Sequence, residues 1–477
     1  MIAKPISEAQ PARNLAEARV RPGLVALFKL ISPFYLHALL GFSSIELRHA
    51  ERLVNAYRDF FSGKTRLLIA FRHPYGDEAQ LMGYVIAKLV GKEAARLGVK
   101  LRRPPHAHFI HGYEVPLWAG AFERWLLPRV GAVPVYHTKL DTKSIGRIRS
   151  LMKDGEYPIA LAPEGQVSYS SETIPRLESG AAHICAWCVD DLARESRKEN
   201  VVILPISVHH RWGAASEKRL DALIGTIEKQ CGISPPTGTS PSVTPPNAAS
   251  PNVTLSVAPP PIASRFNRLS AAADFILDAA ERHYARFYGA SIPRQGDPSR
   301  AERLDDLRKA ALSAAERAFC LKPEGDEIRR VYKIRQTGWD RIFRADIERP
   351  DSLPGLGRAL ADRVAGEAWY ASRHMELVDL TYYLDFDRLK RDDPLDLYIE
   401  TAQNYYDLIA RLEGGNISNR IGIRKKRATI IVGEPIPASE RLSSFGRNRK
   451  TAIEALTLDL KRAYTDCIEE FKLNRDS

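Results

Sequence analysis

The fold is decided by residues 66–80, RLLIAFRHPYGDEAQ, in which a short apolar run is followed by polar residues and then by a helical pattern. Three further short apolar runs, separated by helical stretches, follow it along the chain: HAHFIHG at 106–112, AVPVY at 132–136 and PIALAPE at 158–164. This alternation is typical of an α/β domain. The unbroken apolar start of VVILPISVHHRW, residues 201–212, favours a strand covered on both faces. We therefore expect an α/β fold with a mixed sheet flanked by helices.

The alternation stops after residue 213 and resumes only near the end of the chain. Residues 232–264 form a tract of Pro, Ser, Thr and Asn, and residues 265–415 are almost entirely helical in pattern. RATIIVGEPI at 427–436 has strand character again, which predicts a mostly α-helical insertion within one α/β domain. The predicted boundaries are N-terminal amphipathic helices at 1–54, the first part of the α/β domain at 55–213, a flexible linker at 214–264, the helical insertion at 265–420 and the second part of the domain at 421–477.

The composition narrows the class of partner. Seventy Lys and Arg against 58 Asp and Glu give a net charge of +12, which favours anionic partners such as phospholipid headgroups or acyl carriers. Nucleic acid is not expected, because the chain has neither zinc-finger spacing nor the glycine-aromatic signature of an RNA-binding sheet. Five cysteines do not make a dense disulfide framework, and Cys185 and Cys188 are expected on a buried helix face rather than at a metal.

The N-terminal region contains the most apolar stretch of the chain, Leu24 to Phe42. Lys29, Pro33 and His37 interrupt it, whereas a spanning helix needs about 20 predominantly apolar residues. No secretory signal pattern precedes it. Two interpretations stay open for this stretch: a helix that lies in the membrane interface, and an ordinary helix that docks on the core.

The segment after the first apolar run carries groups suited to acid–base chemistry. His73, Asp77 and Glu78 follow a strand and precede a helix, where a loop can hold side chains in a cleft. His73 as general base would take the proton of a bound alcohol that attacks a thioester, and a carboxylate would fix the imidazole tautomer. Either Asp77 or Glu78 fits that second role, with a slight preference for Asp77. In the alternative interpretation, both acids only complement the helix dipole.

These residues resemble a known family, the glycerolipid acyltransferases of the bacterial 1-acylglycerol-3-phosphate acyltransferase type. Its first block, His-x-x-x-x-Asp, is similar to RHPYGDE, with Glu78 where the family has Asp. Further blocks are matched in order by GAVPVYH at 131–137, APEGQ at 162–166, ESGAAHI at 178–184, ILPISV at 203–208 and VGEPI at 432–436. The resemblance covers roughly residues 55–212 and 425–472 and leaves the helical insertion unmatched.

The resemblance implies an O-acyltransferase that transfers an acyl group from acyl-CoA or acyl carrier protein to a lysophospholipid-like or glycerol-phosphate-like acceptor. It implies no metal and no cofactor, and a cytoplasmic protein attached, as a peripheral or monotopic protein, to the cytoplasmic membrane face. Catalysis would fall to His73, with Asp77 or Glu78. Acceptor binding would fall to residues of the second and third blocks and to nearby cations: Glu164, Gly165, Gln166, His137, Lys139 and Arg176. Oligomeric state is not indicated.

Departures from the family pattern motivate a second hypothesis. The second-block arginine is replaced by His137 and the third-block threonine by Gln166, which removes a fixed cation from the expected phosphate site. A catalytically inactive acyltransferase fold that serves as a membrane or lipid-binding adaptor is the alternative. His106, His108 and His111 lack partner carboxylates or cysteines, so they are expected to be solvent-facing or core histidines rather than metal ligands.

Overall fold

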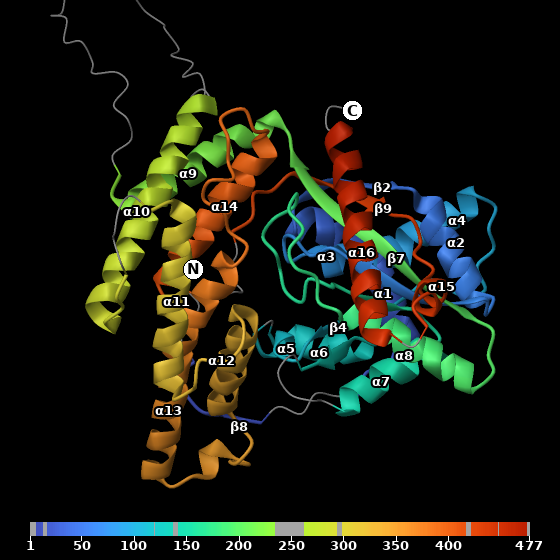
Figure 1. Ribbon diagram of the computed structural model, residues 1–477, viewed down its shortest axis with the longest axis horizontal. Coiled ribbons are helices and arrows are strands. Elements are labelled where there is room, and N and C mark those ends of the chain that lie inside the picture. Colours follow the sequence, from blue (N-terminus) through green and yellow to red (C-terminus); the bar gives the residue numbers. More distant parts are fainter. Residues whose placement is uncertain are drawn as a thin grey trace, which may run out of the picture. The chain divides into compact units, whose positions relative to one another are not determined.

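The computed structural model describes residues 6–12, 17–118, 120–136, 142–233, 262–292, 298–415, 421–446 and 448–474. The chain divides into two compact units. The first, here called the α/β unit, comprises Glu8–Arg211, Arg335–Ala365 and Arg424–Ser477. The second, the helical unit, comprises Met1–Ser7, Trp212–Ile334 and Gly366–Ile423. Many of the helices and strands of both units are labelled in Figure 1.

The α/β unit is built on a seven-stranded sheet. The strand order is β2 (Phe42–Arg48), β9 (Lys426–Val432), β7 (Asn200–Trp212), β3 (Thr65–Phe71), β6 (Ile159–Leu161), β4 (His108–Gly112) and β5 (Val133–Val135). The five strands from β7 to β5 are parallel to one another, and β2 is parallel to β9. The chain leaving β9 pairs antiparallel with β7 at Ile436 and Ile203. The predicted mixed α/β sheet flanked by helices is therefore confirmed.

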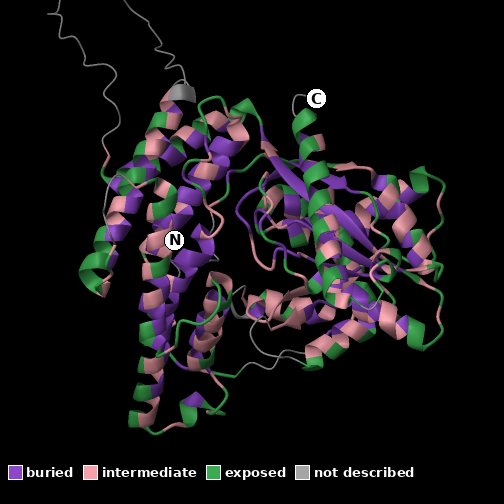
Figure 2. Cartoon of the chain, in the orientation of Figure 1, coloured by how far each residue is buried: buried purple, intermediate pink, exposed green. Residues whose placement is uncertain are grey.

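Alternate residues of β3 bury their side chains on opposite faces of the sheet, as a period of two requires. Leu68 and Ala70 belong to one core cluster, whereas Leu67, Ile69 and Phe71 belong to another. Both faces of β3 and β7 are covered, which explains their unbroken apolar sequences (Figure 2).

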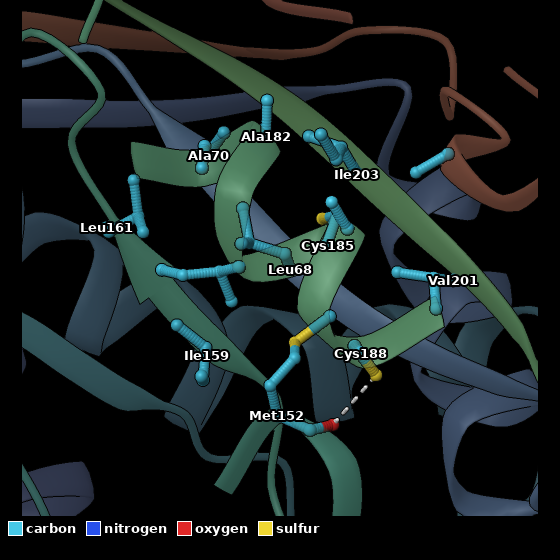
Figure 3. Packing of buried hydrophobic residues seen from close by; sticks show 14 of the residues in the cluster. Leu68, Ala70, Met152, Ile159, Leu161, Ala182, Cys185, Cys188, Val201 and Ile203 are labelled. Atoms are coloured by element: carbon cyan, nitrogen blue, oxygen red, sulfur yellow. Dashed lines mark hydrogen bonds between the residues drawn. The ribbon is translucent and has the colours of Figure 1, made fainter. Parts of the chain in front are cut away.

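The first cluster packs under α7 (Thr142–Asp154), α8 (Gly180–Arg194), α15 (Ala438–Ser443) and α16 (Arg449–Leu473). Cys185 and Cys188 lie in this cluster, beside Leu68, Met152 and Ile203 (Figure 3). Both thiols are buried and free, and burial raises the pKa of Cys188 to about 12. The prediction of a buried helix face is confirmed.

Several of the remaining elements of the α/β unit contribute residues to the second core cluster. The remaining elements are α1 (Pro22–Phe34), the π-helical turn η1 (Tyr35–Leu39), α2 (Ala50–Phe61), α3 (Glu78–Tyr84), η2 (Val85–Leu89), α4 (Val90–Arg96), α5 (Val115–Trp118) and α6 (Ala121–Arg129). A separate pair of two-residue strands, β1 (Gln10–Pro11) and β8 (Phe343–Arg344), is parallel. A short turn, η4 (Pro350–Ser352), follows β8.

The helical unit contains η3 (Ala214–Ser216), α9 (Glu217–Cys231), α10 (Ile262–Tyr288), α11 (Arg300–Phe319) and α14 (Leu395–Leu412). The division between the units falls within α12 (Glu327–Ile342) and α13 (Gly355–Thr381). The chain then returns to the sheet through β9, as the sequence predicted.

Two predicted boundaries are wrong. Residues 42–48, placed in an N-terminal helical segment ending at 54, form the edge strand β2, which pairs with β9. Residues 217–231, placed in the 214–264 linker, form α9, because Leu220, Ile224 and Ile227 recur at helical spacing and are buried. The rest of the predicted linker, from 234 to 261, lies outside the described residues.

Candidate functional site

The candidate site begins where β3 ends. Residues 66–71 of this strand are all buried, so the chain reaches the edge of the sheet at Arg72 and His73. Both parallel neighbours, β6 and β7, end at the same edge. Loops at the carboxyl ends of parallel strands are where open α/β sheets place their ligands.

Arg72 and Glu164 form a fully buried ion pair below this edge. Arg72 Nε lies 3.0 Å from Glu164 Oε1, and neither side chain is exposed. The other guanidinium nitrogens donate to three backbone oxygens in the loop after β6: Ser170 O at 3.0 Å, Ser171 O at 2.5 Å and Thr173 O at 2.8 Å. Such hydrogen bonds compensate the cost of burying two charges. Arg72 therefore fixes the loop that carries the APEGQ motif against the end of β3.

Glu164 was expected to contact the acceptor, and the structure gives it a different environment. Its Oε1 accepts from Arg72, and its Oε2 is buried without a hydrogen bond among the described residues. Gly165 follows with φ of +75°, a left-handed conformation that glycine adopts without strain. Ser168 N then donates to His73 O at 3.0 Å, which joins the two loops.

His73, which directly follows Arg72, forms a hydrogen-bonded dyad with Glu78. His73 Nδ1 lies 2.6 Å from Glu78 Oε2, and the carboxylate also accepts from Tyr75 N and Gly76 N, each at 2.8 Å. Gly76 has φ of +102°, which lets the loop turn its amides toward the carboxylate. Glu78 is fully buried, whereas 22% of the His73 side chain is exposed. The imidazole is thus held at Nδ1, and part of the side chain is exposed to solvent.

Burial lowers the pKa of His73, but the hydrogen bond to Glu78 and the charges of Glu78, Glu164 and Asp77 outweigh that effect and raise the pKa above 6.5. No hydrogen bond to His73 Nε2 is found in the described part of the chain. When Nδ1 carries the proton shared with Glu78, the lone pair of Nε2 is available to accept a proton. This arrangement is that of a general base with an orienting carboxylate.

The slight preference for Asp77 as partner of His73 is wrong. Asp77 immediately precedes α3, and its carboxylate accepts a hydrogen bond from Lys426 Nζ rather than from His73. Glu78 has one more methylene, which allows it to reach back over the loop to His73. Burial raises the pKa of Asp77, but the charges of Lys426 and His210 lower it below its ordinary value.

Asp77, Glu78 and His210 offer ligand atoms within 4.8 Å of one another, a spacing that a metal ion can use. The carboxylates already have partners, however. Asp77 binds the ammonium of Lys426, and the oxygens of Glu78 accept from His73 and two backbone amides. The ammonium of Lys426 thus already supplies the positive charge beside these carboxylates. With these hydrogen bonds in place, the three residues do not fit a metal ion.

The other expected substrate-binding residues lie in different surroundings. The side-chain oxygen and nitrogen of Gln166 are both buried, and neither has a hydrogen bond with any described residue. Arg176 is exposed in the loop that precedes α8. His137 and Lys139 lie outside the described residues.

Three histidines of the β4 region have structural roles, as expected. His106 Nε2 lies 2.7 Å from Val130 O, His108 Nδ1 lies 2.9 Å from Gly131 O, and His111 Nδ1 lies 2.9 Å from Gly112 O. Burial lowers the pKa of all three and brings that of His106 to about 4. Neutral imidazoles bound to backbone carbonyls are not a metal site.

Sequence reasoning missed Arg72 and Lys426. Arg72 was recognisable as the first polar residue after an apolar strand, directly before His73. Lys426 stands at the start of a strand more than 300 residues further along the chain, and only the antiparallel course of β9 brings it to the site. Comparison with protein-family models, with curated proteins and with solved structures finds no match for this chain. Its chemistry is therefore inferred from the geometry of the dyad itself.

Proposed function

We propose that this protein is an O-acyltransferase that transfers an acyl group from a thioester, acyl-CoA or an acylated carrier protein, to a hydroxyl of a lysophospholipid-like or glycerol-phosphate-like acceptor. The observation that carries the proposal is the His73–Glu78 dyad, in which Nδ1 lies 2.6 Å from Glu78 Oε2 and Nε2 has no hydrogen bond with a described residue. The order of motifs that resembles the glycerolipid acyltransferases supports the same chemistry.

In this mechanism Nε2 of His73 takes the hydroxyl proton as the acceptor oxygen attacks the thioester carbonyl. Glu78 stabilises the imidazolium that forms, and general-base assistance of this kind contributes about 10²- to 10⁴-fold in rate. Collapse of the tetrahedral intermediate breaks the C–S bond, and the imidazolium returns the proton to the leaving thiolate. The products are an ester and a free thiol, and His73 is neutral again.

Gln166 is the substrate-binding candidate of the APEGQ loop. Its amide has both a donor and an acceptor without partners among the described residues, and buried polar groups in that state have a free-energy cost of about 1–3 kcal/mol each. The loop is tied to His73 O through Ser168 N and to Arg72 through Glu164. A substrate carbonyl or hydroxyl bound there would satisfy the amide.

The first experiment measures free-thiol release from palmitoyl-CoA and from an acyl carrier thioester, with lysophospholipids, glycerol 3-phosphate and phosphate-free alcohols as acceptors. We expect acceptor-dependent release that His73→Ala abolishes without loss of folding by circular dichroism. His283→Ala, an exposed histidine of α10, is the matched control. Release that survives His73→Ala contradicts the mechanism, and no release with any pair favours the lipid-binding adaptor.

A membrane surface is the second part of the proposal. Pro22–Leu39 is long and apolar enough to cross a membrane, by length and composition, and little of it is buried in the protein. The inner side of α1 packs on α3, where Phe28 lies against Gly83. Its outer side exposes large apolar residues: Leu27, Leu30, Ile31 and Phe34. A helix attached to the core on one side and apolar on the other favours lying in the membrane interface.

Helix α6 also exposes large apolar side chains. The chain before α1 is joined to the end of α6 by hydrogen bonds from Arg19 N to Pro128 O and from Arg21 N to Arg129 O, each 2.8 Å. Phe122 and Trp125 of α6 are exposed, and Arg129 lies over the Trp125 ring. Aromatic and basic side chains together suit the headgroup region of an anionic bilayer.

A matched pair of variants tests this surface. Leu30 and Leu356 are equally exposed, at 76%, but only Leu30 lies on α1. We expect Leu30→Glu to weaken cosedimentation with vesicles of anionic phospholipid by at least tenfold, since a buried leucine is worth about 1.5–3 kcal/mol. Leu356→Glu should bind as the unchanged protein does. Equal loss in both variants would contradict the assignment of α1 as the membrane contact.

A further inference from the structure

Three carboxylates act electrostatically on the His73 imidazole, and each has a partner among the described residues. Glu78 is hydrogen-bonded to His73 itself, and Glu164 is paired with Arg72. The third carboxylate, Asp77, is paired with Lys426. All three influence the proton affinity of His73. The charge that His73 experiences therefore depends on how completely Arg72 and Lys426 neutralise their partners.

Lys426 is held in place from two sides. Its ammonium binds the carboxylate of Asp77 and lies 4.4 Å from the centre of the Phe42 ring, and only 12% of the side chain is exposed. Lys426 begins β9 and Phe42 begins β2. Because these two strands run antiparallel to β7 and β3, their starts lie at the edge where β3 ends. The fold thus delivers a fixed cation from the C-terminal segment to the dyad.

The remaining groups around Asp77 do not replace Lys426. His210 Nε2 lies 3.8 Å from Asp77 Oδ1, beyond hydrogen-bond distance, and its ring packs 4.2 Å from Tyr75 and 5.4 Å from Phe42. Lys426 is the only described residue with a permanent positive charge that is ion-paired with Asp77.

We propose that Lys426 is a positioning residue of the dyad: its ammonium binds the Asp77 carboxylate and offsets the charge that Asp77 presents to His73, which favours the neutral imidazole that acts as a base. Only the effect of Lys426 on catalysis rests on the proposed acyl-transfer function. The electrostatic relation among Lys426, Asp77 and His73 is a property of the folded protein and is measurable without a substrate.

The direction of the effect follows from the charges. An unpaired carboxylate near an imidazole favours the imidazolium, and imidazolium cannot accept a proton from the acceptor hydroxyl. Glu78 orients the ring through its hydrogen bond, and a second uncompensated carboxylate would shift His73 further toward the imidazolium. Lys426 removes that second charge while leaving the hydrogen bond to Glu78 intact.

The test is a pH titration of the imidazole nitrogens by NMR on the full chain, with His73 identified by the signal that disappears in His73→Gln. We expect Lys426→Met to raise the titration midpoint of His73 by on the order of one pH unit. Asp77→Asn in the Lys426→Met background should restore the original midpoint. Lys425→Met removes a charge from the adjacent, exposed residue and should leave the midpoint unchanged.

Two further variants keep the test decisive if Lys426→Met does not fold. Lys426→Arg preserves the charge and should preserve the midpoint, whereas Asp77→Asn alone should lower it. A midpoint unaffected by Lys426→Met, or lowered by it, overturns the proposal. If His73 titrates unchanged but the KM for phosphate-bearing acceptors rises, Lys426 binds the acceptor instead, and the proposal is also overturned. Failure of thiol release with an upward shift would contradict the proposed enzyme and leave this inference standing.

Discussion

Replacement of Glu78 by glutamine tests the centre of the proposed mechanism. The carboxylate Oε2 accepts from both His73 Nδ1 and Gly76 N, while Oε1 accepts from Tyr75 N. An amide can keep only one of these oxygens as an acceptor. If its NH2 group takes the place of Oε2, it faces two donors, so His73 must either turn or move its proton to Nε2. In both cases the lone pair needed for catalysis is lost.

The expected magnitude follows from the hydrogen bond that disappears. A hydrogen bond to a charged group contributes about 1.5–3 kcal/mol, which corresponds to roughly a 10- to 150-fold loss in kcat/KM. The pKa of His73 should change as well. Without the carboxylate that raises it, the burial of the imidazole should bring this pKa below 6.5. The acid limb of the rate profile should therefore move to lower pH while the plateau falls.

The assay is acceptor-dependent thiol release measured from pH 5 to pH 9, with Glu454→Gln on the exposed side of α16 as the control carboxylate. Glu78→Asp shortens the side chain by one methylene and should recover part of the plateau only if the carboxylate still reaches Nδ1. A plateau within twofold of the unchanged protein in Glu78→Gln, or an acid limb that moves to higher pH, would refute the assigned role of Glu78.

Three predictions concern the protein without substrate. Arg72→Met should lower the free energy of unfolding by about 3–5 kcal/mol in urea titrations, because Glu164 keeps a buried charge without its cation; a loss under 1 kcal/mol would contradict the role of the pair. The folded protein keeps His106 neutral down to pH about 4, whereas the unfolded chain protonates it near 6.5, so stability should fall as pH drops through this range. His106→Gln should flatten that fall, and an unchanged slope would refute the assignment. Native-state thiol labelling should modify Cys320 rapidly and leave Cys188 unmodified, and equal rates would show that α8 opens readily.

The sequence predicted the parts of the fold whose patterns are strong. The apolar runs at 66–71 and 201–208 correspond to β3 and β7, because strands buried on both faces require apolar residues throughout. Strand β2, FSSIELR, was missed because it is at the edge of the sheet and exposes most of its polar residues. Its register is set by β9, which no local pattern of residues 42–48 reports.

The candidate site shows the same limit. Spacing alone placed His73 near two acids but did not distinguish Asp77 from Glu78, since the choice depends on the loop conformation at Gly76. Lys426 has no motif of its own, and its importance comes from an antiparallel strand that arrives from the far end of the chain. The proximity of His73 to the two acids was predictable from the sequence. The position of Lys426, which pairs with Asp77, is determined by the topology of the sheet.

The position of β9 between β2 and β7 has a consequence for synthesis of the protein on the ribosome. Ser43, at the start of β2, hydrogen-bonds to a residue 382 positions later, so β2 cannot pair until that later segment has been made. Until then β7 has an unpaired edge, which is a template for aggregation and a reason for slow, late assembly. A nascent chain stopped before residue 426 would already contain His73 and Glu78 but not Lys426 or the strand that carries it. The complete site therefore forms only after residue 426 has been translated.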